Sequence, residues 1–140
     1  MLTGLVVALI VLGAIYGYVA IRPVPPIDAD FGPDKQSFSV PMPADEVFKV
    51  VEGLPVSAAK YKLGRADATK RRVILHDGMG MKSYGNFYPI DVTPTASGSD
   101  VTVGIKSKYP LQFGPFVRKQ RDAQLAAIVS DVKAKLAGTI

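Results

Sequence analysis

The sequence contains no cysteine, no tryptophan and a single histidine, His76. Without cysteine the chain can form neither disulfides nor thiolate metal sites. One histidine leaves only an oxygen-rich metal site, which needs several neighbouring carboxylates, and the sequence shows no such group. We therefore predict that the chain binds no metal and no other cofactor.

Complete phosphate-binding motifs are also missing. The stretch "HDGMGMKSYG" at residues 76–85 has three glycines and a Lys-Ser pair. The P-loop template needs glycine where His76 and Met81 stand, and the dinucleotide template needs glycine at Ser83. The stretch is therefore interpreted as a connection between strands, with two methionines that suit an adaptable protein contact.

Groups suited to acid–base catalysis are few. His76 is interpreted as a surface residue at the end of a strand, and the adjacent Asp77 would point to the opposite face. Asp45 and Glu46 fit the start of a helix, Asp91 alternates outward in its strand and Asp100 belongs to a hairpin turn. No nucleophile-elbow motif is present, and no group is predicted to have a shifted pKa. We predict that the chain is not an enzyme.

Charge is absent from the first 21 residues. Twenty apolar or small residues from Leu2 to Ile21 would span roughly 30 Å as a helix, the thickness of a bilayer core. The alternative, a cleaved signal peptide, needs a basic residue before the run and a small-x-small site after it. Neither is present, so residues 1–21 are predicted to be a transmembrane helix, with Tyr16 and Tyr18 in the interfacial belt.

All 17 Lys and Arg lie at or after Arg22. The positive-inside rule then places the N-terminus outside and the rest of the chain in the cytoplasm. We expect a single-pass protein of the cell membrane, namely a bacterial inner membrane. Small residues four apart let helices approach closely in lipid, and here they lie on two nearly opposite faces, predicting two neighbours: Gly4 with Ala8, and Gly13 with Gly17 and Ala20.

Residues 22–35 form a proline-rich linker, for which we expect an extended path that lifts the domain off the membrane. Residues 36–140 are predicted to be one α+β domain. A strand with Phe38, Val40 and Met42 on one face precedes a helix that starts at Pro43 and ends at Gly53 and Pro55. Four further strands are expected, at 60–67, 71–77, 87–94 and 100–108.

Pro89 within the third of these strands predicts an edge position or a bulge. A long helix over 116–136 closes the chain. Its apolar residues recur at helical spacing and predict a stripe that faces the sheet: Leu125, Ile128, Val129, Val132 and Leu136. Gly138 is the expected stop signal. The economical arrangement is a small antiparallel sheet of about five strands, packed by a short helix and a long C-terminal helix.

This order, with "FSVPMPADEVFKVV" and the final helix from Pro115, resembles the START-type helix-grip superfamily, which includes polyketide-cyclase-like domains. The likeness covers residues 36–137 and departs from the family in having five strands for seven and one helix for a pair. It implies a hydrophobic ligand between sheet and long helix, lined by Tyr61, Tyr88, Val103, Val129 and Val132. A second likeness, in "IDVTPTASGSDVTVGIKSK", is to small uncharacterised bacterial and plastid proteins and implies no function.

Two functions follow as expectations. The first is a non-catalytic accessory subunit that stabilises a larger integral-membrane complex, with the lipid bilayer and other membrane subunits as its partners. The second, the alternative, is a membrane-anchored domain that binds a lipid or other hydrophobic ligand. Nucleic acid is not expected as a partner, because the one basic run, "KRR" at 70–72, fits a solvated turn. The expected partner contacts are Met79, Met81, Lys82, Tyr109, Leu111 and Phe113.

Overall fold

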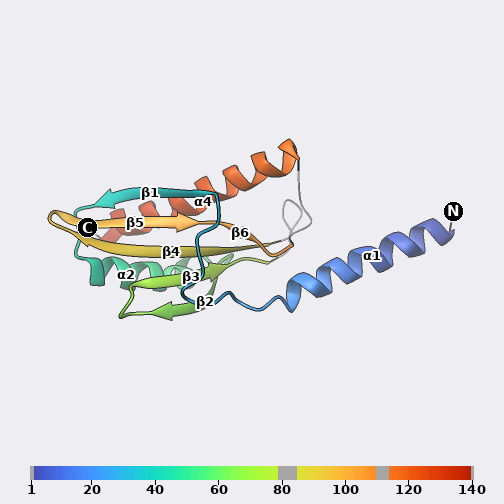
Figure 1. Cartoon of the computed structure of the whole chain (residues 1–140), viewed down its shortest axis with the longest axis horizontal. Helices are drawn as coiled ribbons and strands as arrows, with labels where there is room; N and C mark the ends of the chain where they lie inside the picture. The colour runs from blue at the N-terminus through green and yellow to red at the C-terminus, as the bar shows by residue number, and fades with distance from the viewer. Residues whose placement is uncertain (1, 79–84, 110–113, 140) are drawn as a thin grey trace.

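The computed structural model describes residues 2–78, 85–109 and 114–139. A long helix, α1, projects from one end of an α+β domain whose sheet is covered on one face by helices (Figure 1). The elements in chain order are α1 (Leu2–Ala20), β1 (Lys35–Val40), α2 (Ala44–Glu52), α3 (Leu54–Ser57), β2 (Lys62–Asp67), β3 (Arg72–His76), β4 (Asn86–Thr95), β5 (Gly98–Gly104), β6 (Lys106–Ser107) and α4 (Pro115–Thr139). The predicted fold class is confirmed.

The six strands form one antiparallel sheet in the order β1-β5-β4-β3-β2, with β6 also paired to β4. The strands predicted at 60–67 and 71–77 pair as β2–β3, and those predicted at 87–94 and 100–108 pair as β4–β5. The sixth strand arises because the last predicted strand is interrupted at Ile105, which divides it into β5 and β6.

Pro89 explains this interruption and corrects the prediction that it marks a sheet edge. β4 is an inner strand, paired on both sides. The backbone groups of its even-numbered residues bond to β3, so the nitrogen of Pro89 faces the β5 side and has no hydrogen to donate there. The register is the same before and after the gap, with Phe87 opposite Lys106 and Ile90 opposite Val103.

The helix that starts at Pro43 is α2, with Asp45 and Glu46 in its first turn as expected. Gly53 ends α2, but Pro55 does not end the helical segment. It lies in the first turn of α3, where a proline loses no hydrogen bond. The prediction of a single helix at this place is therefore wrong, since the structure has a helix pair.

The core lies between α2, α4 and the sheet face that they cover, here called the inner face. The predicted stripe of α4 is correct, since all five of its residues are buried, at most 5% exposed. Gly138 does not stop α4, which continues to Thr139. No side chain packs against Gly138 in the described part of the chain, and an exposed helix end tolerates glycine at a cost of only about 1 kcal/mol.

Residues 22–34, here called the strap, cross the opposite, outer face of the sheet (Figure 1). Arg65 donates from Nε to the Pro25 carbonyl at 2.8 Å, and the Lys106 Nζ lies 2.8 Å from Asp30. Gly104 leaves room for Phe31, because a Cβ there would lie 2.7 Å from the Phe31 oxygen. The segment is extended, as its prolines predict, and it packs on the outer face of the sheet.

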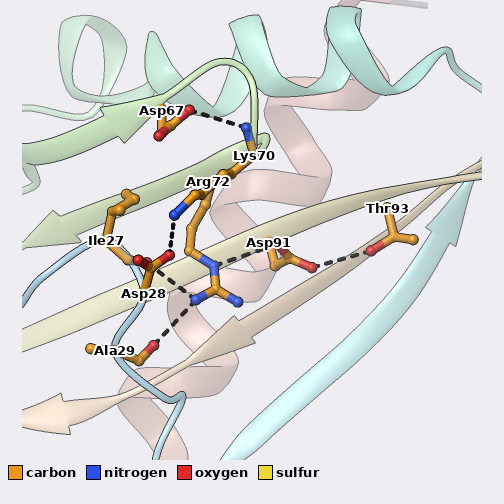
Figure 2. A network of polar contacts seen from close by, with 8 residues as sticks. All are labelled: Ile27, Asp28, Ala29, Asp67, Lys70, Arg72, Asp91 and Thr93. Atoms are coloured by element: carbon orange, nitrogen blue, oxygen red, sulfur yellow. Dashed lines mark hydrogen bonds and ion pairs between the residues drawn. The ribbon is translucent and has the colours of Figure 1, made fainter.

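Arg72 holds the strap most closely (Figure 2). Its guanidinium donates to the carbonyls of Ile27 and Ala29 at 3.1 and 3.3 Å and lies over the Phe31 ring at 4.8 Å. Its Nε is 3.5 Å from an Asp91 oxygen. The neighbouring basic residues are paired too, Lys70 with Asp28 and Arg71 with Asp45. In the "KRR" run, Lys70 and Arg71 lie in the expected turn with partly exposed side chains, whereas Lys70 and Arg72 also attach the strap.

α1 is the one helix of the described chain that is long and apolar enough to cross a membrane. Nearly all of it is exposed, and this is compatible with a membrane anchor. Among the described residues, its last turns lie against the domain. Val19 is 3% exposed, and the rings of Tyr18 and Tyr109 meet edge to face at 6.3 Å.

Candidate functional site: a polar cluster inside the helix grip

Four polar side chains meet inside the otherwise apolar grip between the sheet and α4, and we call them the polar cluster: Asp77, Asn86, Tyr88 and Gln124. Asp77 accepts from the backbone N–H of Asn86 and from the Tyr88 hydroxyl, both at 2.7 Å. The Asn86 Nδ2 donates to the Gln124 Oε1 at 2.6 Å. Asn86 and Tyr88 are 3% and 1% exposed.

The period of two along a strand places these groups. Val73 and Leu75 of β3 belong to the inner core, so the next residue of that parity, Asp77, also faces inward. Tyr88, Ile90 and Val92 do the same on β4. His76 therefore points to the outer face, and the expectation that His76 and Asp77 separate onto opposite faces is correct.

A second polar pair extends the cluster along α4. The Tyr61 hydroxyl donates to Asp131 at 2.6 Å, and the Lys60 Nζ lies 3.2 Å from the same carboxylate. The rings of Tyr61 and Tyr88 meet edge to face with centroids 5.8 Å apart. Two tyrosines thus carry hydroxyls into the grip and join the two polar groups through their rings.

Burial shifts the protonation of these groups. Burial raises the pKa of Asp77, although the Tyr88 hydroxyl and the Asn86 N–H, as donors to the carboxylate, oppose the rise. Burial, with nearby carboxylates, raises the pKa of Tyr61 and of Tyr88, so both stay neutral hydroxyls. The prediction of no shifted pKa is therefore wrong. The error comes from Asp77, whose burial depends on how β3 pairs and how α4 covers its end.

The cluster offers a carboxyl, an amide pair and a hydroxyl, which can both donate and accept hydrogen bonds. Among the residues that the structure describes, no three His, Asp or Glu side chains are grouped to hold a metal ion. Such a set suits recognition of a polar end on an otherwise apolar molecule. The cluster itself was not singled out from the sequence, apart from Tyr88. An Asp directly after a strand with the apolar run Val73–Leu75 was the available signal.

The five predicted ligand-lining residues lie together in the inner core. Each is at most 5% exposed, and all belong to one packed cluster: Tyr61, Tyr88, Val103, Val129 and Val132. Val103 comes from the middle of β5, and the two other valines from α4. Of the five, Tyr88 is a member of the polar cluster, and the Tyr61 ring contacts the Tyr88 ring.

The other predicted residues lie at the α1 end or beyond the described chain. Tyr109 is half-buried against Tyr18, whereas the remaining expected contacts lie outside the described residues: Met79, Met81, Lys82, Leu111 and Phe113. In α1, no described atom outside the helix's own adjacent residues lies within 4 Å of a Cβ built on Gly4, Gly13 or Gly17. Ala8 and Ala20 are also exposed.

His76 is not a free surface histidine. It is half-buried, and its Nδ1 lies 2.9 Å from the Nζ of Lys108. Its ring is tilted against Phe87 at 6.0 Å. Burial, together with the charges of Lys108 and Lys62, lowers the pKa of His76, so the imidazole is neutral at pH 7.

No protein-family model matches this chain, and no curated protein sequence is similar to it. Solved structures do match. They include a START superfamily protein from Mycobacterium smegmatis, at 12% identity over 76% of this chain and 98% of that one, with a TM-score of 0.53. MLL2253 from Mesorhizobium loti matches at 8% identity over 76% and 98%, with a TM-score of 0.55. TTHA0849 from Thermus thermophilus matches at 12% identity over 75% and 97%, with a TM-score of 0.52. At these identities the likeness shows the fold alone, and the domain has the START-type helix-grip fold.

Proposed function

We propose that the chain is a membrane-anchored helix-grip domain that binds a lipid or a similar hydrophobic molecule between its sheet and α4. The observation that carries this proposal is the polar cluster, buried at one end of an apolar interior. An apolar tail gains about 0.8 kcal/mol for each CH₂ it buries. The polar end of the same molecule would exchange hydrogen bonds with Asn86, Tyr88 and Gln124.

The polar cluster lies at the end of the domain from which α1 projects. β3 ends there, β4 begins there, and α4 begins on the same side (Figure 1). His76 and Gly78, which flank Asp77, line one cavity together with Val19 and Ala20 of α1. If α1 is embedded, a molecule that leaves the bilayer meets this end of the grip first.

The first turns of α4 support entry at this end. Residues 115–124, all of which the structure describes, include none that is buried, and Phe116 is 70% exposed. The buried stripe begins only at Leu125. Polar contacts such as Gln124–Asn86 and Arg121–Asp34 hold these turns to the rest of the domain. A segment without buried residues can separate at a low free-energy cost and admit a ligand beside Gln124. We assign no catalytic step to the site.

Native mass spectrometry of the full chain, released from detergent micelles after exchange of the detergent, tests this proposal. We expect one apolar molecule per chain to remain bound. Tyr88→Phe and Gln124→Ala should each lower its occupancy about tenfold, since each removes a polar partner worth roughly 1–1.5 kcal/mol. Gln120→Ala, one turn earlier in α4, is the matched control. A chain that never retains a molecule, or variants that bind as well as the control, would contradict the proposal.

The accessory-subunit role remains a second proposal, with α1 in the inner membrane and the domain in the cytoplasm. Its support is that no described atom packs on the glycines of α1, so a neighbouring helix could approach them closely. Gly13→Leu with Gly17→Leu should then release the chain from its complex in native gels of solubilised membranes. A native chain that already migrates alone would exclude this role.

A further inference from the structure

A cavity of about 210 Å³ lies between the last turns of α1 and the outer face of the sheet. α1 contributes Tyr16, Val19 and Ala20 to its wall, and the sheet side contributes Lys62, His76 and Lys108. Since a water molecule occupies about 30 Å³ in the liquid, this junction cavity has room for a group several times larger than water. It lies on the opposite side of the sheet from the polar cluster.

Three nitrogen groups converge on the cavity from different parts of the sheet. Lys62 of β2 is directly opposite His76 of β3, so the two side chains share a face. Lys108 follows β6 and continues its ladder, because its N–H donates to the Gly85 carbonyl at 3.0 Å. Its side chain then reaches His76.

The charge of Lys108 is poorly compensated. Lys108 is only 6% exposed, and its Nζ contacts the neutral His76 ring and the face of Phe87 at 5.1 Å. Within residues 2–78, 85–109 and 114–139, no carboxylate lies within ion-pair distance of Lys62 or Lys108. A buried ammonium without an anion is costly. Burial lowers the pKa of Lys108, although the more distant charge of Asp77 opposes this shift. The lowered pKa agrees with the missing counter-charge.

We propose that the junction cavity binds a phosphate group, with Lys62, Lys108 and His76 as its donors, and that the phosphate belongs to an anionic phospholipid. The position of the cavity favours the lipid as the source. Tyr16 and Tyr18 lie at the C-terminal end of the apolar helix, at the level of the headgroups if α1 spans the bilayer. The cavity then opens beside the headgroups in either membrane orientation. An anionic lipid would fix the domain against the surface and supply the missing counter-charge.

The test uses the full chain in nanodiscs that contain equal amounts of phosphatidylglycerol and phosphatidylcholine. Native mass spectrometry after release measures the ratio of the two lipids retained per chain. A lysine near an anionic surface strengthens attachment by about fivefold. Lys62→Gln should therefore lower the preference for phosphatidylglycerol about fivefold, and the double variant with Lys108→Gln about 30-fold. Lys62 is exposed, so its single variant is readable even where the double variant fails to fold.

Lys135→Gln is the matched control, because it removes the same charge from an exposed position near the end of α4 and should leave the preference unchanged. A second arm measures whether inorganic phosphate raises the melting temperature of the chain in pure phosphatidylcholine nanodiscs. A rise that Lys62→Gln abolishes, with no lipid preference, would keep the phosphate site and overturn the lipid as its source. If neither lipid preference nor phosphate effect depends on Lys62, the proposal fails. The variants of Tyr88 and Gln124 act on the inner face and leave this test unaffected.

Discussion

Replacing Arg72 by methionine should detach the strap from the sheet while the inner core stays intact. The change removes two hydrogen bonds to strap carbonyls. Together they contribute about 1.5–3 kcal/mol, because the donor is charged and lies where water is excluded. Loss of the contact with the Phe31 ring adds about 0.5–1 kcal/mol, and loss of the partly exposed pair with Asp91 adds about 0–1 kcal/mol. These contacts share one guanidinium and are not additive, so we expect a total loss of about 2–3 kcal/mol.

The assay is thermal unfolding of the full chain in detergent, followed by the near-ultraviolet circular dichroism of tyrosine, since the chain has no tryptophan. One kcal/mol shifts the melting temperature of a domain of about 100 residues by about 4 °C, so Arg72→Met should lower it by roughly 10 °C. Arg71→Met is the control. Its surface pair with Asp45 is worth below about 1 kcal/mol. If both variants melt alike, the strap is not held by Arg72 and the reasoning is refuted.

Two further predictions concern a titration and a close approach. Because the folded pKa of Asp77 is raised, this carboxyl binds more protons in the folded than in the unfolded state above about pH 4, and its contribution to the free energy of unfolding falls as pH rises through its folded pKa. Asp77→Asn should flatten that slope in denaturant titrations at pH 4–8, and an unchanged slope would show that another group causes it. Gly104→Ala should cost about 1–3 kcal/mol, because its Cβ would meet Phe31 at 2.7–2.9 Å. Gly138→Ala, in open space, should be neutral or gain up to about 1 kcal/mol, and equal melting of the two variants would argue against the strap contact.

Periodic segments were predictable from the sequence because each obeys a local rule. The stripe of α4 and the alternation of β1 depend only on side chains of the same segment, and the structure has them as expected. The charges Asp45 and Glu46 at the start of α2 are equally local. The long helix and the hairpins then left few ways to cover one sheet face, so the fold class followed as well.

Contacts between distant segments could not be predicted. The strap has the composition of a linker, and only the pairing of Arg72 with carbonyls more than 40 residues earlier reveals that it packs on the sheet. Asp77 reads as a strand-end residue until Tyr88 and Asn86 enclose it. Pro89 lacks a backbone hydrogen wherever it lies, and this effect is local. Its place in the sheet could not be predicted, because an inner strand tolerates the missing hydrogen where the neighbouring strand is interrupted.

A photocrosslinking map tests the central claim, that the grip takes up a molecule from the bilayer, most directly. The full chain would be placed in nanodiscs containing a phospholipid with a diazirine on its acyl chain, irradiated, digested and sequenced by mass spectrometry. The account predicts crosslinks on inner-face peptides of β4, β5 and α4, around Tyr88, Val103 and Gln124, in addition to those on α1. Crosslinks confined to α1 would contradict it.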